Sequence, residues 1–150
     1  MQLSKFSDYA LRATVLLASD PERLISTRHI AEVYDAKYFH MAKVTGWLVA
    51  NGFMVSLRGR GGGLRLAQKP SDISLGALLR KLEAERPIVD TTRDAEGNGH
   101  DLPQELVASL SAAQDAFYKE LDPITIADVV AKSPNIVALV ENLDAVSAQA

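Results

Sequence analysis

Two groups of side chains in the first half of the chain have the types and spacing to bind a polyanion. They are Lys37, Phe39, His40 and Lys43 in the first group, and Arg58, Arg60 and Arg65 in the second. Lysine, histidine and arginine hydrogen-bond to phosphates and base edges, and a phenyl ring can contact a thymine methyl group. Arginine also suits forked phosphate contacts and the narrow minor groove. The chemistry they indicate is DNA binding.

The charge of the chain is distributed unevenly, although the net charge is only −3. Residues 1–70 carry ten Lys/Arg against five Asp/Glu, a net +5, and residues 71–150 carry six against fourteen, a net −8. Such an asymmetry favours contact of the first half with a polyanion, while chance scatter of surface charge is the alternative.

Hydrophobic periodicity predicts the elements that position these groups. A helix is expected at 4–19 with Ser4 as its cap, and a short helix is expected to start near Ser26 or Thr27. A tight connection at 35–36 leads to a helix at 37–50, which Asn51-Gly52 ends because both residues tolerate the left-handed conformation. The remaining expected elements are strand-like segments at 53–57 and 64–67 and helices at 75–84, 103–121, 125–132 and, weakly, 135–145.

This order predicts a mainly α fold, a winged helix-turn-helix DNA-binding domain with a long C-terminal helix. The helix at 37–50 is the expected recognition helix, with its N-terminal end on base edges and Arg28 of the preceding helix beside it. The glycine-rich link at 58–63 is the expected tip of a basic β-hairpin, whose glycines let the backbone approach the sugar–phosphate wall. The predicted division is a DNA-binding domain at 1–84, a loop at 85–102, helices at 103–132 and a tail at 133–150.

The helix at 103–121 carries an apolar stripe whose members are Leu106, Leu110, Phe117 and Leu121. Such a stripe fits either a core within the chain or a seam between two chains. A second ambiguity concerns Trp47, Phe53 and Phe39, which fit an apolar ligand pocket or, equally, core and groove contacts.

The sequence lacks the residues that several other classes of function require. The absence of cysteine excludes disulfides, thiolate nucleophiles and zinc ribbons. No nucleophile–base pair or phosphate-cradling G-x-x-x-x-G-K-[ST] motif is found, so no enzymatic activity is predicted. Neither a secretory signal nor an apolar stretch long enough for a membrane span is recognisable, so the expected location is the cytoplasm.

Three segments together resemble the Rrf2 family of bacterial winged-helix regulators. They are MQLSKFSDYALRA, LRGRGGGLRLA and ISLGALLRKLE, and the later AAQDAFYKELDPITIADVV is similar to the nitric-oxide-sensing NsrR branch of that family. The resemblance covers about residues 1–132. It implies a homodimer that packs through the helix at 103–121 and binds a palindromic operator, with each wing in a minor groove.

The resemblance also implies an iron–sulfur sensor, with three cysteines in the loop before the dimer helix and an aspartate from the first helix of the other subunit. Asp8 matches the aspartate. The cysteine positions fall at Thr91, near Asn98 and at Gln104, and none of these residues is a soft ligand. The sequence therefore departs from the family at its sensor, and no cofactor is predicted.

His100 is the remaining candidate metal ligand, with Asp8, Asp94, Glu96 and Asp101 as possible neighbours. A lone loop histidine is far more often solvated, so no metal site is predicted. The sequence predicts a homodimeric, sequence-specific DNA-binding repressor that works without a cluster. The alternative is an interaction module that titrates or heterodimerises with a related regulator. The releasing signal is left open between a small molecule, a protein partner and none.

Overall fold

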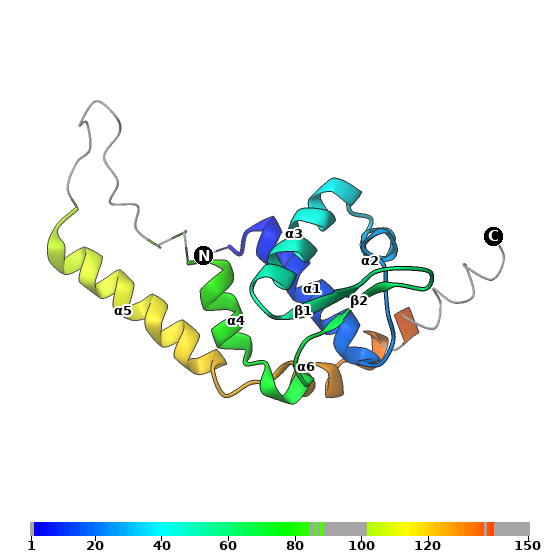
Figure 1. Cartoon of the computed structure of the whole chain (residues 1–150). Helices are drawn as coiled ribbons and strands as arrows, with labels where there is room; N and C mark the ends of the chain where they lie inside the picture. The colour runs from blue at the N-terminus through cyan, green and yellow to red at the C-terminus, as the bar shows by residue number, and fades with distance from the viewer. Residues whose placement is uncertain (1, 85, 87, 89–101, 137, 140–150) are drawn as a thin grey trace, which may run out of the picture.

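The computed structural model describes residues 2–84, 86, 88, 102–136 and 138–139. Those residues form a mainly helical molecule with one two-stranded sheet, as the sequence predicted (Figure 1). The elements in chain order are α1 (Lys5–Ser19), α2 (Thr27–Val33), α3 (Tyr38–Ala50), β1 (Met54–Leu57), β2 (Gly63–Leu66), the 3-10 helix η1 (Pro70–Asp72), α4 (Leu75–Leu82), α5 (Gln104–Leu121) and α6 (Ile126–Ala131).

Serine caps begin three of the helices. Ser4, Ser26 and Ser74 precede α1, α2 and α4, and each side chain accepts a hydrogen bond from the backbone N–H three residues later. The predicted cap at Ser4 is confirmed, and of the two expected starts of the second helix the structure has Ser26 as its cap. The end of α3 differs in detail, because only Gly52 is left-handed, at φ +76°. Asn51 has φ −94°, and its side-chain amide donates to the carbonyl of Trp47 at 3.0 Å.

The core forms around α1, which packs against α3, α4, α6 and β2. Its largest fully buried apolar side chains are Leu16, Leu17, Ile30, Met41, Leu48, Met54, Ile73, Leu78 and Ile126. They come from α1, α2, α3, β1, α4, the segment just before α4, and α6, so the helix-turn-helix and the hairpin share one core. The residues predicted to face inward from the helix at 37–50 (Met41, Val44 and Leu48) are all buried.

The long helix α5 extends away from this core as an arm (Figure 1). Tyr118 is its one buried residue among those described, and α4 is the element that packs most against it. The chain then returns to the core through α6, whose Ile126 N–H donates to the carbonyl of Ile73 at 2.9 Å. The predicted segment 103–132 therefore divides into an arm and a core helix. Beyond it, residues 134–136 and 138–139 are helical, and the rest of the predicted 135–145 helix lies outside the described residues.

None of the described helices is both long enough and apolar enough to cross a membrane.

Candidate nucleic-acid interface

The helix-turn-helix consists of α2, a four-residue connection and α3. Asp35 lies in the left-handed region at φ +47°, where the chain reverses, and the N–H of Ala36 donates to the carbonyl of Ala31 at 2.8 Å. Aspartate tolerates this conformation better than most non-glycine residues. The turn sets the angle at which α3 leaves α2, and it leaves the N-terminal end of α3 projecting from the body (Figure 1).

The predicted recognition residues share the solvent side of α3. Lys37, Phe39, His40 and Lys43 are all exposed, and Phe39 is 64% exposed despite its apolar ring. The ammonium group of Lys43 lies 4.5 Å from the centroid of the Phe39 ring. This cation–π contact holds a positive charge and an apolar surface together at the start of the helix. The pair matches what base edges and thymine methyl groups require.

Arg28 and Tyr38 form a second contact of the same kind, and the sequence analysis missed the tyrosine. The guanidinium carbon of Arg28 lies 5.2 Å from the ring centroid of Tyr38, which is 52% exposed. The contact joins α2 to the first residue of α3. The sequence does show an aromatic residue directly after Lys37. That Tyr38 pairs with Arg28, however, depends on the angle between α2 and α3, which the sequence does not give.

Lys5 is a further cation that sequence reasoning did not place at this surface. A small hollow of about 200 Å³ between α1 and α3 is lined by Lys5, Tyr9, His40 and Lys43, with Phe6 and Val44. Lys5 is thus brought beside the predicted recognition residues by the packing of α1 on α3. No local pattern in the sequence could have shown this, because the contact spans more than thirty residues.

The wing is an antiparallel hairpin with Met54 opposite Leu66 and Leu57 opposite Gly63. Its tip carries Arg58 and Arg60, both exposed. Two tip glycines have positive φ, +108° at Gly59 and +78° at Gly61, a conformation that glycine adopts readily. The predicted hairpin tip at 58–63 is therefore confirmed, and the approach of its backbone to DNA stays a prediction. A Cβ at Gly62 would meet the backbone carbonyl of Leu57, so the tip is packed too closely for a side chain at that position.

The wing is also tied to the segment that leads into α2. Ile25 and Leu64 form an antiparallel bridge, with Ile25 N–H to Leu64 O at 3.0 Å and Leu64 N–H to Ile25 O at 2.9 Å. The bridge lies next to the Ser26 cap, so hairpin and helix-turn-helix are joined through their backbones. Arg65 is on the outer face of β2, where it lines a hollow with Glu22 and α6, away from the tip.

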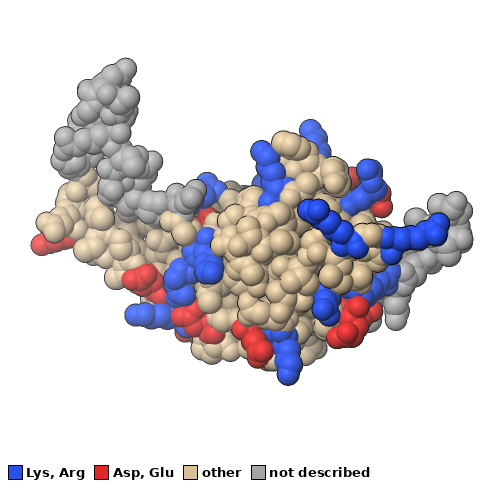
Figure 2. All heavy atoms as spheres, in the orientation of Figure 1, with Lys and Arg blue, Asp and Glu red and all other residues tan. Residues whose placement is uncertain are grey.

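Lysine and arginine gather over α2, α3 and the wing, whereas acidic side chains are frequent along the α5 and α6 edge (Figure 2). The charge is therefore distributed unevenly over the surface as well as along the sequence. A surface of this kind attracts a polyanion and orients it.

Comparison with known proteins decides the family. Residues 3–132 match the Rrf2 family, which is described as iron-dependent transcriptional regulators. The chain belongs to the Rrf2 family. DNA is the kind of partner that such regulators bind, and the basic surface is where this Rrf2 protein presents the matching charge.

Individual relatives agree with this assignment. The chain is 41% identical over 133 residues to the transcriptional repressor NsrR of Streptomyces coelicolor, which covers 87% of this chain and 89% of that protein. Two solved structures share the fold of this Rrf2 protein. IscR of T. potens has a TM-score of 0.71 at 24% identity, covering 90% of each chain. CymR, the global cysteine regulator of B. subtilis, has a TM-score of 0.69 at 23% identity, covering 88% of this chain and 98% of that one.

The donor atoms of this Rrf2 protein do not fit an iron–sulfur cluster. The sequence contains no cysteine, and no group of three metal-ligating residues occurs among the described ones. Thr91, Asn98 and His100 lie outside the described residues. Gln104 is the exposed first residue of α5 and offers only a neutral amide.

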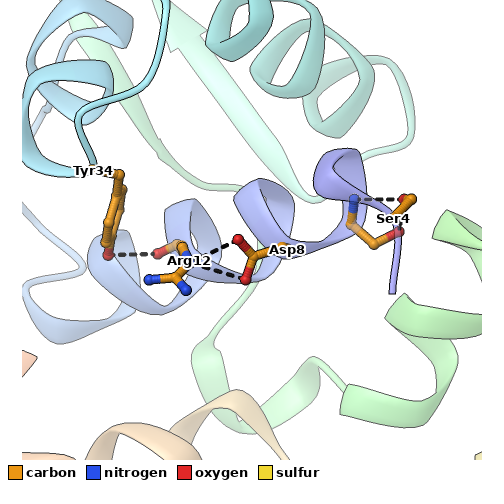
Figure 3. Close-up of polar contacts among 5 residues, drawn as sticks. Ser4, Asp8, Arg12 and Tyr34 are labelled. Atoms are coloured by element: carbon orange, nitrogen blue, oxygen red, sulfur yellow. Dashed lines mark hydrogen bonds and ion pairs between the residues drawn. The ribbon is translucent and has the colours of Figure 1, made fainter. Parts of the chain in front are cut away.

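Asp8 already has a partner on its own helix. The Arg12 Nε lies 2.9 and 3.0 Å from the two Asp8 carboxylate oxygens (Figure 3). Tyr34, at the end of α2, donates its hydroxyl to the Arg12 carbonyl at 3.1 Å, and its ring lies 5.7 Å from the Arg12 guanidinium. Burial raises the pKa of Tyr34. The Asp8 carboxylate therefore holds the Arg12 side chain, which in turn contacts Tyr34 and so joins α1 to the helix-turn-helix.

Proposed function

We propose that this protein is a homodimeric, sequence-specific DNA-binding repressor of the cytoplasm that acts without an iron–sulfur cluster. The observation that carries the proposal is the backbone bridge between Ile25 and Leu64, which holds the exposed arginines of the wing and the exposed face of α3 on one rigid unit. Lys37, Phe39, His40 and Lys43 are assigned to the major groove, Arg58 and Arg60 to phosphates or a minor groove, and Arg28 and Arg65 to the flanking backbone.

The dimer is assigned to α5. Leu106 is 44% exposed, and Leu110, Phe117 and Leu121 are only partly buried. An exposed apolar stripe on a protruding helix is typical of an interface between chains. A two-fold axis through this stripe would place two recognition helices on a palindromic operator, one helical turn of DNA apart. Repression is supported by the 41% identity to a repressor.

The decisive experiment is DNA selection with the purified chain alone, followed by gel-shift titration on the selected duplex and on the promoter of its own gene. A symmetric selected site and loss of binding in the Arg58→Ala/Arg60→Ala variant are expected. The matched control is Lys119→Ala/Lys132→Ala, which removes the same charge from exposed residues of α5 and the end of α6. Retained affinity in the wing variant would refute the role of the wing.

Failure of the chain to shift any duplex alone, with binding restored by a related regulator, would instead support the interaction-module alternative. The division of the chain at residues 84, 102 and 132 remains a prediction that the same preparation can test by limited proteolysis.

A further inference from the structure

A hollow of about 720 Å³ lies where the first turn of α1, the last turn of α3 and the end of α4 meet. Its volume is in the range of small-molecule sites, about 300–1,000 Å³. It is separate from the surface assigned to DNA, because none of the predicted DNA-binding residues lines it. The residues that line this hollow include Phe6, Trp47, Asn51, Lys81, Leu82 and Arg86.

Aromatic rings form one wall of this hollow. Phe6 meets Trp47 edge to face, with ring centroids 6.0 Å apart and planes at 88°. Trp47 in turn stacks on Phe53, with centroids 6.2 Å apart and planes at 12°. Phe53 is only 8% exposed, whereas Phe6 and Trp47 are partly exposed. The wall is therefore anchored in the core by Phe53 and presents Phe6 and Trp47 to a planar apolar ligand.

Two cations border the same hollow. Lys81 and Arg86 are both exposed, and the Lys81 ammonium lies 5.5 Å from the centroid of the Phe53 ring. No carboxylate among the described residues lies within ion-pair distance of either one. Glu83, which lies between them in sequence, accepts a hydrogen bond from the Ser4 N–H at 3.0 Å and lines the neighbouring hollow. Arg86 also lines that neighbouring hollow and is close enough to Glu83 to act on it electrostatically. Among the described residues, however, neither cation forms an ion pair with a carboxylate, so both can meet an anion.

We propose that this hollow binds a small aromatic carboxylate, with its ring against Phe6 and Trp47 and its carboxylate between Lys81 and Arg86. The ring requires a planar apolar surface and the carboxylate requires charge-assisted donors, and the hollow offers both on adjacent walls. Asn51 directs one of the two N–H donors of its Nδ2 to the Trp47 carbonyl at 3.0 Å, and the other donor can supplement the two cations. A bound ligand contacts α3 and α4 together, and so touches both the helix assigned to base reading and the helix that leads to the arm.

Trp47 is the single tryptophan of the chain, so the tryptophan fluorescence comes entirely from a residue in the wall of this hollow. The test titrates the full-length protein, without DNA, with phenylacetate, acetate and 2-phenylethanol, and repeats each titration by calorimetry. Saturable binding is expected for phenylacetate. Acetate lacks the ring and 2-phenylethanol lacks the charge, so each should bind at least about tenfold more weakly. Equal affinity for phenylacetate and either analogue, or no saturable binding, would overturn the proposal.

Charge-removing variants locate the site. Lys81→Gln and Arg86→Gln should each weaken phenylacetate binding about fivefold, the size of one exposed ion pair. Lys119→Gln removes an exposed cation from α5, outside the hollow, and should leave the affinity unchanged. Unchanged affinity in both hollow variants would also overturn the assignment. Because the readout is ligand binding without DNA, this result is independent of whether the proposed repressor function holds.

Discussion

Arg80 and Asp122 form a two-point ion pair that joins α4 to the residue that ends α5. Nη1 and Nη2 of the arginine lie 3.1 and 3.0 Å from Oδ1 and Oδ2 of the aspartate. The same guanidinium lies 5.1 Å from the ring centroid of Tyr118, and the Ser74 hydroxyl donates to the Asp122 carbonyl at 2.9 Å. The base of the arm is therefore held to α4 and its cap through the last turn of α5 and the residue that ends it.

Gly76 tests how closely α4 and the end of α5 must approach. A Cβ at this position would lie 2.6 Å from both the Asp122 backbone nitrogen and the Tyr118 carbonyl oxygen. Gly76→Ala should therefore lower the free energy of unfolding by about 1–3 kcal/mol, measured by urea denaturation. Gly46→Ala is the control, because a Cβ there meets nothing within 4 Å, and in a helix interior it should stabilise by up to about 1 kcal/mol. Equal stability of the two variants would contradict the close approach.

Charges placed on α5 test the proposed dimer interface. Leu106→Glu/Leu110→Glu puts two carboxylates on the apolar stripe, and a buried like-charge cluster across a two-fold axis is strongly unfavourable. We expect a monomer by sedimentation equilibrium. Ala108→Glu/Ala112→Glu adds the same charge to exposed positions on the other side of the same helix and should leave a dimer. If the stripe variant remained dimeric, the interface would have to be placed elsewhere.

The wing and α3, the two parts proposed to contact DNA, should differ in how their substitution changes DNA affinity and sequence preference. If Arg60 contacts a phosphate, the first of its two proposed assignments, Arg60→Ala should weaken binding similarly on all duplexes, and the slope of log affinity against log salt should fall by about 1. His40→Ala should instead relax preference at one or two operator positions, at about 1–3 kcal/mol for a lost base contact. Competition binding on a panel of singly substituted operators separates the two outcomes. A uniform loss in His40→Ala would move that residue to the backbone.

Glu83 should make stability depend on pH. Partial burial raises the pKa of its carboxyl, but hydrogen bonds from Ser7 and Ser4 outweigh burial and hold the pKa below its ordinary 4.5. The stabilisation is thus complete above pH 4.5 and is lost as the pH falls through the lower pKa of the folded state. Glu83→Gln should be less stable than the parent near neutral pH and match it in acid.

Chemical denaturation at several pH values measures this difference. Glu120→Gln, which removes an exposed carboxyl of α5, is the control for general charge effects. A gap between Glu83→Gln and the parent that did not narrow in acid would contradict the role of these hydrogen bonds.

Much of the fold could be read from local pattern. Ser4, Ser26 and Ser74 cap helices through a bond to the third residue on, and that signal is contained in a few consecutive residues. The hairpin was equally local, since glycines separate two short apolar runs. For this reason the structure bears out the elements predicted up to residue 132, with most of their boundaries.

The interface was predicted less completely, because its remaining members come together only in three dimensions. The Arg28–Tyr38 pair depends on the angle between α2 and α3, and Lys5 reaches α3 from the other end of the core. Arg65 looked equivalent to Arg58 and Arg60 in sequence, but β2 places it beside the hollow that Glu22 and α6 line, away from the hairpin tip. This is why it is assigned to the flanking DNA backbone and not grouped with the two tip arginines.

The backbone pairing of Ile25 with Leu64 fixes the distance between the wing and the start of α2. Because these two residues exchange backbone hydrogen bonds beside the start of α2, the wing cannot shift along DNA without carrying α2 with it. If the hairpin enters one groove and α3 reads another, as proposed, the two grooves must be held at one separation. Operator bases between the two proposed contacts should then matter through how easily the duplex bends to that separation, even where no side chain touches them.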